Sequence, residues 1–144
     1  MMIARIAGLL VLAVAAGCPA GAMAYDIAFT LDSTLGAGRN VDFAIVDPPQ
    51  SVEVAPNGSQ VLDVPYPTSG ATPVFRFYEV RVTAKGENTM EYCAFSARAD
   101  YLVASGWGCT IAPVRQTDAA TCTGMLASGW NRSKPCAFQL RIQP

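Results

Sequence analysis

The chain has 144 residues, a formal net charge of −1 and no histidine. The lack of histidine excludes Ser-His-Asp and Cys-His mechanisms, histidine general bases and nearly all zinc hydrolase sites. Charged residues form no run of one sign, so nucleic acid is not an expected partner. No motif in the sequence predicts a metal site or a cofactor.

Residues 1–24 are predicted to be an export signal. Met1–Arg5 forms a positively charged start, and residues 6–17 form an apolar run that is too short to span a bilayer. The segment ends in Ala-Met-Ala, a pattern that signal peptidases accept, so the mature chain is expected to begin at Tyr25 in a bacterial periplasm or the medium. The alternative is a lipobox at Cys18, which would tether the protein to the outer membrane. No later apolar run predicts a transmembrane segment.

Residues 25–144 are expected to form one exported domain, because about 120 residues match the size of a single domain. Acidic residues dominate up to Thr72, and basic residues outnumber acidic ones beyond it. This difference is expected to mark two solvated ends of the same domain.

Two alternating segments open the domain. Residues 25–32 place apolar side chains at every second position, and residues 41–46 repeat the pattern. The intervening residues 35–40 are rich in turn formers. The pattern predicts that the two segments form a hairpin.

A second hairpin is predicted between residues 51–54 and 60–64. Both segments are rich in valine, and Pro-Asn-Gly lies between them. Asn57 and Gly58 tolerate positive φ at low cost, which suits them to a tight turn.

The next segment, residues 65–73, contains three prolines and is expected to cross between two sheets. Residues 74–83 form the longest predicted strand, and residues 89–97 are expected to return beside it after a turn at 85–88. Each face of the 74–83 strand carries both apolar and charged side chains. Only residues 118–127 are compatible with a short helical turn, which their threonines and glycine weaken.

Short strands, regularly spaced turns and ten prolines predict an all-β fold, a single antiparallel β-sandwich or small barrel. Disulfides are expected to cross-link its C-terminal third, where Cys93, Cys109, Cys122 and Cys136 lie.

Three connectivities of these cysteines are possible, and a mirrored sequence order favours a nested one. Cys-Ala-Phe occurs at residues 93–95 and 136–138, outside two Ser-Gly-Trp turns. If the two halves are antiparallel arms, Cys93 pairs with Cys136 and Cys109 pairs with Cys122. The alternative is sequential pairing of Cys93 with Cys109 and of Cys122 with Cys136, which would close two short loops.

The candidate binding residues lie in and beside the two Ser-Gly-Trp turns. Trp107 and Trp130 are large amphipathic rings next to glycine, and Arg132 and Lys134 follow the second ring. The alternative is that each ring folds inward against a disulfide. Trp130 is the better candidate for exposure, because its neighbours are polar and Trp107 lies close to Cys109.

These features favour a noncatalytic binding or interaction module, such as an inhibitor, an adhesin component or an accessory envelope or secretion protein. Its partner would be another protein or a surface glycan, and a carbohydrate-binding domain is the second hypothesis. A small hydrolase is the third. It would need a carboxylate pair such as Asp26 with Asp32, or Glu79 with Glu91.

Overall fold

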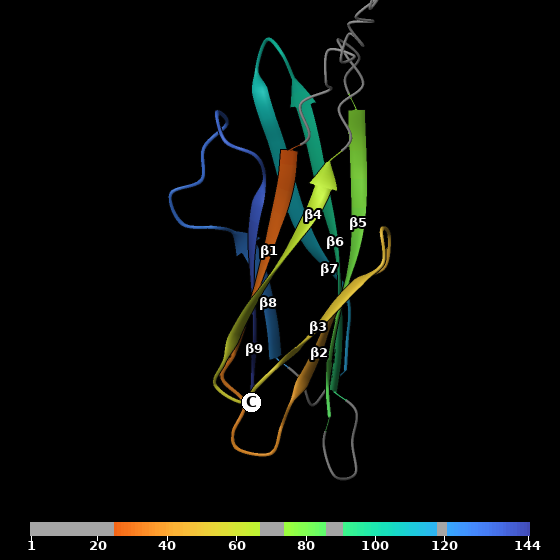
Figure 1. Cartoon of the computed structure of the whole chain (residues 1–144), viewed down its shortest axis with the longest axis vertical. Helices are drawn as coiled ribbons and strands as arrows, with labels where there is room; N and C mark the ends of the chain where they lie inside the picture. Colours follow the sequence, from red (N-terminus) through yellow and green to blue (C-terminus); the bar gives the residue numbers. More distant parts are fainter. Residues whose placement is uncertain (1–24, 67–73, 86–90, 118–120) are drawn as a thin grey trace, which may run out of the picture.

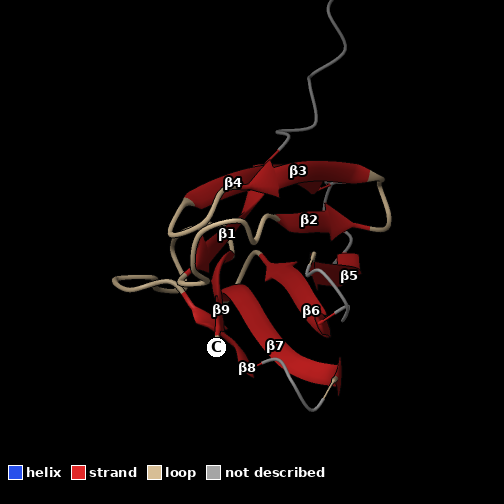
Figure 2. Cartoon of the chain, turned by 90° about the horizontal axis from the view of Figure 1, so that it is seen from below, coloured by secondary structure: helices blue, strands red, loops and turns tan. Residues whose placement is uncertain are grey.

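The computed structural model describes residues 25–66, 74–85, 91–117 and 121–144. The predicted signal peptide and the tether at Cys18 therefore lie outside the described residues. The described residues form two sheets packed as a sandwich, which confirms the predicted all-β fold (Figures 1 and 2). The strands are β1 (Tyr25–Ser33), β2 (Val41–Ile45), β3 (Gln50–Val54), β4 (Ser59–Tyr66), β5 (Val74–Ala84), β6 (Glu91–Leu102), β7 (Gly106–Gln116), β8 (Thr121–Leu126) and β9 (Ala137–Gln143).

The four-stranded sheet has the order β4-β1-β9-β8, and the five-stranded sheet has the order β3-β2-β5-β6-β7. β1 pairs with β9 in parallel, which makes the first sheet mixed rather than purely antiparallel. In the view from below, β3 and β4 lie end to end along one side of the sandwich (Figure 2).

The period-two alternation of the sequence places the core between the sheets. On β1 the buried residues alternate with partly exposed ones, and β2 and β9 repeat this pattern. Phe29 of β1 lies at the centre, where its ring stacks on Phe138 with centroids 5.1 Å apart and meets Tyr78 edge-on at 5.4 Å. The predicted apolar faces of both early segments are therefore correct.

The predicted pairing of these two segments is wrong. β1 pairs with β4 and β9, whereas β2 pairs with β3 and β5 in the other sheet. Their apolar faces meet across the core instead of lying side by side in one sheet. Residues 34–40 are enough to cross the roughly 10 Å between two packed sheets, and buried Leu35 covers the end of the core on the way.

The predicted second hairpin is also wrong in its pairing, although its turn forms. Asn57 has φ of 54°, and the Gly58 N–H donates to the Ala55 carbonyl at 2.9 Å. β3 and β4 nevertheless belong to different sheets, so this turn forms a corner of the sandwich.

The remaining strand predictions have mixed outcomes. β4 and β5 lie in different sheets, which confirms the crossover at 65–73, although residues 67–73 lie outside the described ones. β5 and β6 form the expected antiparallel pair, and the turn predicted at 85–88 falls largely on undescribed residues. The described part of residues 118–127, the segment compatible with a short helical turn, contains no helix. Residues 121–126 form β8 and pair with β9, because threonine favours an extended chain and Gly124 fits closely under Phe95.

The disulfides join Cys93 to Cys122 and Cys109 to Cys136, so the nested and the sequential pairings are both wrong. Cys93 lies level with Gln116 at the end of β7, whereas the Cys136 carbonyl accepts from Ala28 near the start of β1. The two Cys-Ala-Phe segments thus lie at opposite ends of the sandwich. Each bridge instead connects one sheet to the other. The presence of two disulfides indicates an oxidising, extracytoplasmic compartment.

Candidate functional site

Trp107, one of the predicted binding residues, belongs to the core. Only 2% of its surface is exposed. Its ring packs against Tyr66 at 4.8 Å, Tyr101 at 5.1 Å and Tyr25 at 5.3 Å. Tyr25 and Tyr101 are themselves partly buried. The aromatic cluster closes one end of the sandwich and does not offer the indole face of Trp107 to solvent.

Trp130, Arg132 and Lys134 come together on the loop between β8 and β9, which projects from the sandwich (Figure 1). The Trp130 ring is partly buried against the core, and its Nε1 donates to the Pro135 carbonyl at 3.0 Å. Arg132 and Lys134 are exposed. The loop therefore presents two cations, while the indole N–H is already occupied within the loop.

The loop that carries Trp130 contacts the start of β7. The Trp107 N–H donates to the Arg132 carbonyl at 2.8 Å. Gly106 has φ of 77°, and a Cβ there would lie 2.2 Å from the same carbonyl oxygen. Glycine is therefore needed where β7 meets the loop.

The candidate carboxylate pair of Asp26 and Asp32 is not arranged as a glycosidase site. Asp26 and Asp32 are six residues apart on β1, about 20 Å along a strand, whereas such pairs lie roughly 5–10 Å apart. Asp32 accepts a hydrogen bond from the amide of Gln139. Glu79 forms an ion pair with Arg81 at 2.7 Å. The side chain of Glu91 lies outside the described ones.

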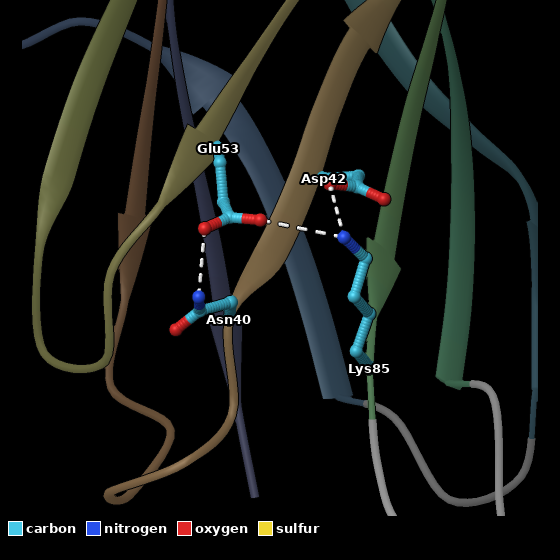
Figure 3. Close-up of polar contacts among 4 residues, drawn as sticks. All are labelled: Asn40, Asp42, Glu53 and Lys85. Atoms are coloured by element: carbon cyan, nitrogen blue, oxygen red, sulfur yellow. Dashed lines mark hydrogen bonds and ion pairs between the residues drawn. The ribbon is translucent and has the colours of Figure 1, made fainter.

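A polar network joins β2, β3 and the end of β5 (Figure 3). Lys85 Nζ lies 3.1 Å from Asp42 and 3.3 Å from Glu53, and the Asn40 amide donates to Glu53 at 2.7 Å. Hydrogen bonds to Asp42 and then to Glu53 raise the pKa of Lys85 above its usual value. The ammonium group thus bridges the two carboxylates and offsets one of their two negative charges, and the network has a structural role in joining three strands.

The most exposed aromatic side chains in the described part of the chain lie elsewhere, on the outer face of the five-stranded sheet. Phe75 is 54% exposed and Phe77 is 63% exposed, both on the central strand β5. Phenylalanine has no polar group to favour this position, so neighbouring exposed rings are typical of a contact surface. The mixed faces of the 74–83 segment were the sequence signal for this site, but they did not reveal which face is solvent-exposed.

The charges around the two rings are paired with one another. The Arg98 guanidinium lies 4.9 Å from the centroid of Phe75 and 3.5 Å from the Asp100 carboxylate. Asp100 lies over Gly108, because a Cβ added at Gly108 would be 2.7 Å from a carboxylate oxygen of Asp100. Together with the pair of Glu79 and Arg81 described above, these contacts pair the charges beside the two rings.

An open depression of about 370 Å³ adjoins this face where β2 ends. Its lining includes Arg81 and the directly opposed residues Ala44 and Ser51. The outer face of the sheet thus combines a pair of exposed rings with a shallow neighbouring recess.

None of the described residues forms a helix long and apolar enough to cross a membrane. A comparison with protein-family models found no match, and searches of curated proteins and of solved structures found no significantly similar protein.

Proposed function

We propose that this protein is an exported, noncatalytic binding module, and that its contact surface is the outer face of the five-stranded sheet around Phe75 and Phe77. The exposure of these two rings on a central strand carries the proposal. Burying apolar surface contributes about 25 cal/mol per Å², so a partner that covers two rings gains affinity without any catalytic group.

The partner class favoured by this surface is another protein. The charges beside the two rings are mutually paired, so a highly charged ligand would gain little there. Carbohydrate recognition is the second hypothesis, and the inward position of Trp107 removes one of the two rings that supported it. The loop with Trp130, Arg132 and Lys134 remains a second surface on which a partner can make contacts.

Both intersheet disulfides support a location outside the cytoplasm. We place the mature protein in the periplasm or the medium, with attachment to the outer membrane through Cys18 as the alternative.

Site-specific photo-crosslinking in the host that exports the protein tests the proposed surface. A photoreactive phenylalanine analogue replaces Phe77 in one variant and Met125, which is 58% exposed on the other sheet, in the control. A third variant carries the analogue at Lys134. We expect a discrete adduct from position 77 alone. An adduct only from position 134 would move the site to the Trp130 loop, and equal adducts from all positions would contradict a specific surface.

A further inference from the structure

β2 is shorter than its neighbour β5 and leaves half of it uncovered. The two strands pair from Val41 with Ala84 to Ile45 with Val80, and the final contact is the Val46 N–H to the Glu79 carbonyl at 3.0 Å. The chain then turns away toward β3 (Figure 1). Beyond Glu79, no described strand lies beside residues 74–78 on the side away from β6.

The exposed main-chain groups belong to the same two phenylalanines. In an antiparallel strand, the N–H and C=O of one residue point to one side, and those of the next residue point to the other. Since Glu79 uses its carbonyl on the β2 side, Phe77 and Phe75 also direct their main-chain groups to that side. No described residue bonds to these groups.

Of the four edge strands, β7, β4 and β3 carry features that oppose strand addition, whereas β8 contains neither proline nor a bulge but carries no aromatic side chain. β7 contains Pro113 and pairs irregularly with β6 at Ala94 and Phe95. β4 contains Pro65, and β3 follows two prolines directly. Proline and bulges are the usual protection of sheet edges. Residues 74–78 contain neither feature.

We propose that the open half of β5 binds an extended segment of a different protein, which adds to the sheet as an antiparallel strand in the line of β2. This inference rests on the proposed function and specifies how that surface binds. The added strand would exchange main-chain hydrogen bonds with Phe75 and Phe77. Its side chains opposite these residues would lie against the two rings on the outer face.

The charge of Arg76 favours a different protein over a second copy of this chain as the partner at this edge. Two copies that pair residues 74–78 in antiparallel register would place Arg76 directly opposite its own counterpart, and like charges in this position repel. Directly opposite side chains approach most closely at such a pair, where no main-chain bonds are exchanged. Arg76 forms an ion pair with Asp47 at 3.3 Å, and the Asp47 side chain is largely exposed. An acidic side chain on the added strand would give Arg76 a second partner.

The preferred segment therefore has an acidic residue between two apolar residues. A suitable probe is a fluorescent peptide of seven residues with blocked ends, in which a central glutamate is flanked by two valines. The control peptide has the same sequence with both valines N-methylated. This change removes the two donors that would face Phe75 and Phe77 and keeps every side chain. Fluorescence anisotropy with the mature protein measures both affinities.

We expect saturable binding of the probe and at least tenfold weaker binding of the N-methylated control. R76E should weaken binding of the glutamate peptide and strengthen binding of a peptide with a central lysine. Equal binding of the probe and its N-methylated form, or no saturation at millimolar concentration, overturns strand addition. Sedimentation that reveals a dimer abolished by F77P would assign the edge to a second copy instead.

These outcomes are distinct from failure of the proposed function. If position 77 crosslinks to a partner in the host but N-methylation has no effect, the surface is correct and the strand-addition mode is wrong. If position 77 forms no specific adduct and no peptide binds, both proposals fail.

Discussion

Asp42 and Glu53 lie directly opposite each other on β2 and β3, although both are acidic. Lys85 Nζ lies within 3.3 Å of each carboxylate and so offsets a repulsion that would otherwise weaken the pairing of the two strands (Figure 3). All three side chains are about half exposed, so the strength of this network depends on salt.

Replacement of this lysine tests the network. K85Q should lower the free energy of unfolding at low salt, and the difference from the parent should shrink in 1 M NaCl because ions screen exposed charges. The raised pKa of Lys85 means that its contribution is fully present below the unfolded value of 10.5 and is lost as pH rises through the folded value. Urea denaturation at two salt concentrations measures the effect.

K134Q is the matched control, because Lys134 Nζ has only a 3.5 Å contact with the Gly129 carbonyl. Equal losses for K85Q and K134Q at both salt concentrations would contradict the role of the network.

Removal of the hydroxyl group should change stability differently at two buried tyrosines. Tyr78 Oη is buried with no hydrogen-bond partner, whereas Tyr66 Oη accepts from the Tyr101 N–H at 3.1 Å. Y78F should leave stability unchanged or raise it, since an unsatisfied polar group costs about 1–3 kcal/mol. Y66F should destabilise by about 1 kcal/mol. Chemical denaturation of both variants tests this contrast, and a larger loss for Y78F would contradict it.

Alkaline pH provides a second test of Tyr78. Burial raises the pKa of Tyr78 to about 12. The unfolded chain releases this proton near pH 10, so stability should fall as pH rises from 10 toward 12. Y78F should remove part of this fall. Identical pH profiles for Y78F and the parent would show that Tyr78 ionises as readily in the folded protein as in the unfolded chain.

Replacement by alanine should destabilise the protein to different extents at two glycines with similar backbone angles. Gly106 and Gly129 have φ of 77° and 75°, so alanine at either position is strained by about 1–2 kcal/mol. At Gly106 the new Cβ would also meet the Arg132 carbonyl at 2.2 Å, whereas at Gly129 nothing lies within 4 Å. G106A should therefore be clearly more destabilising than G129A in thermal unfolding. Equal costs would mean that the loop moves freely away from β7.

The disulfide connectivity can be read directly by mass spectrometry. Trypsin cleaves between all four cysteines, so a non-reducing digest should link the Cys93 peptide to that of Cys122, and the Cys109 peptide to that of Cys136. Any peptide that links Cys93 to Cys136 or to Cys109 would contradict the fold. Loops of 29 and 27 residues predict a loss of about 3.5 kcal/mol for each bridge replaced by serines.

Mutation of the exposed ring should separate binding from folding. F77S should change stability by no more than about 0.5 kcal/mol, because surface substitutions rarely cost more. The core control F29A should cost about 3–5 kcal/mol. If F77S abolishes binding of the partner and leaves the melting temperature unchanged, the result supports the contact surface. A large drop in melting temperature would instead give Phe77 a role in packing.

The sequence by itself determined the features that depend on neighbouring residues. Alternation in segments such as 25–32 predicted both the strands and their buried faces, and the prolines of residues 65–73 predicted a crossover. The turn at Asn57 was predictable too, since positive φ is a local preference of asparagine. These predictions succeeded because a period of two along a strand is a local property of the chain.

Only the tertiary structure decided which strands pair, which cysteines meet and which aromatic rings face solvent. A short connection can join neighbouring strands within one sheet or cross to the other sheet. The connection between β1 and β2 crosses to the other sheet. The tertiary structure also places Cys93 and Cys136 at opposite ends, buries Trp107 and leaves Phe75 and Phe77 outside. Each of these outcomes depends on contacts between segments far apart in the chain, whose energies no local pattern contains.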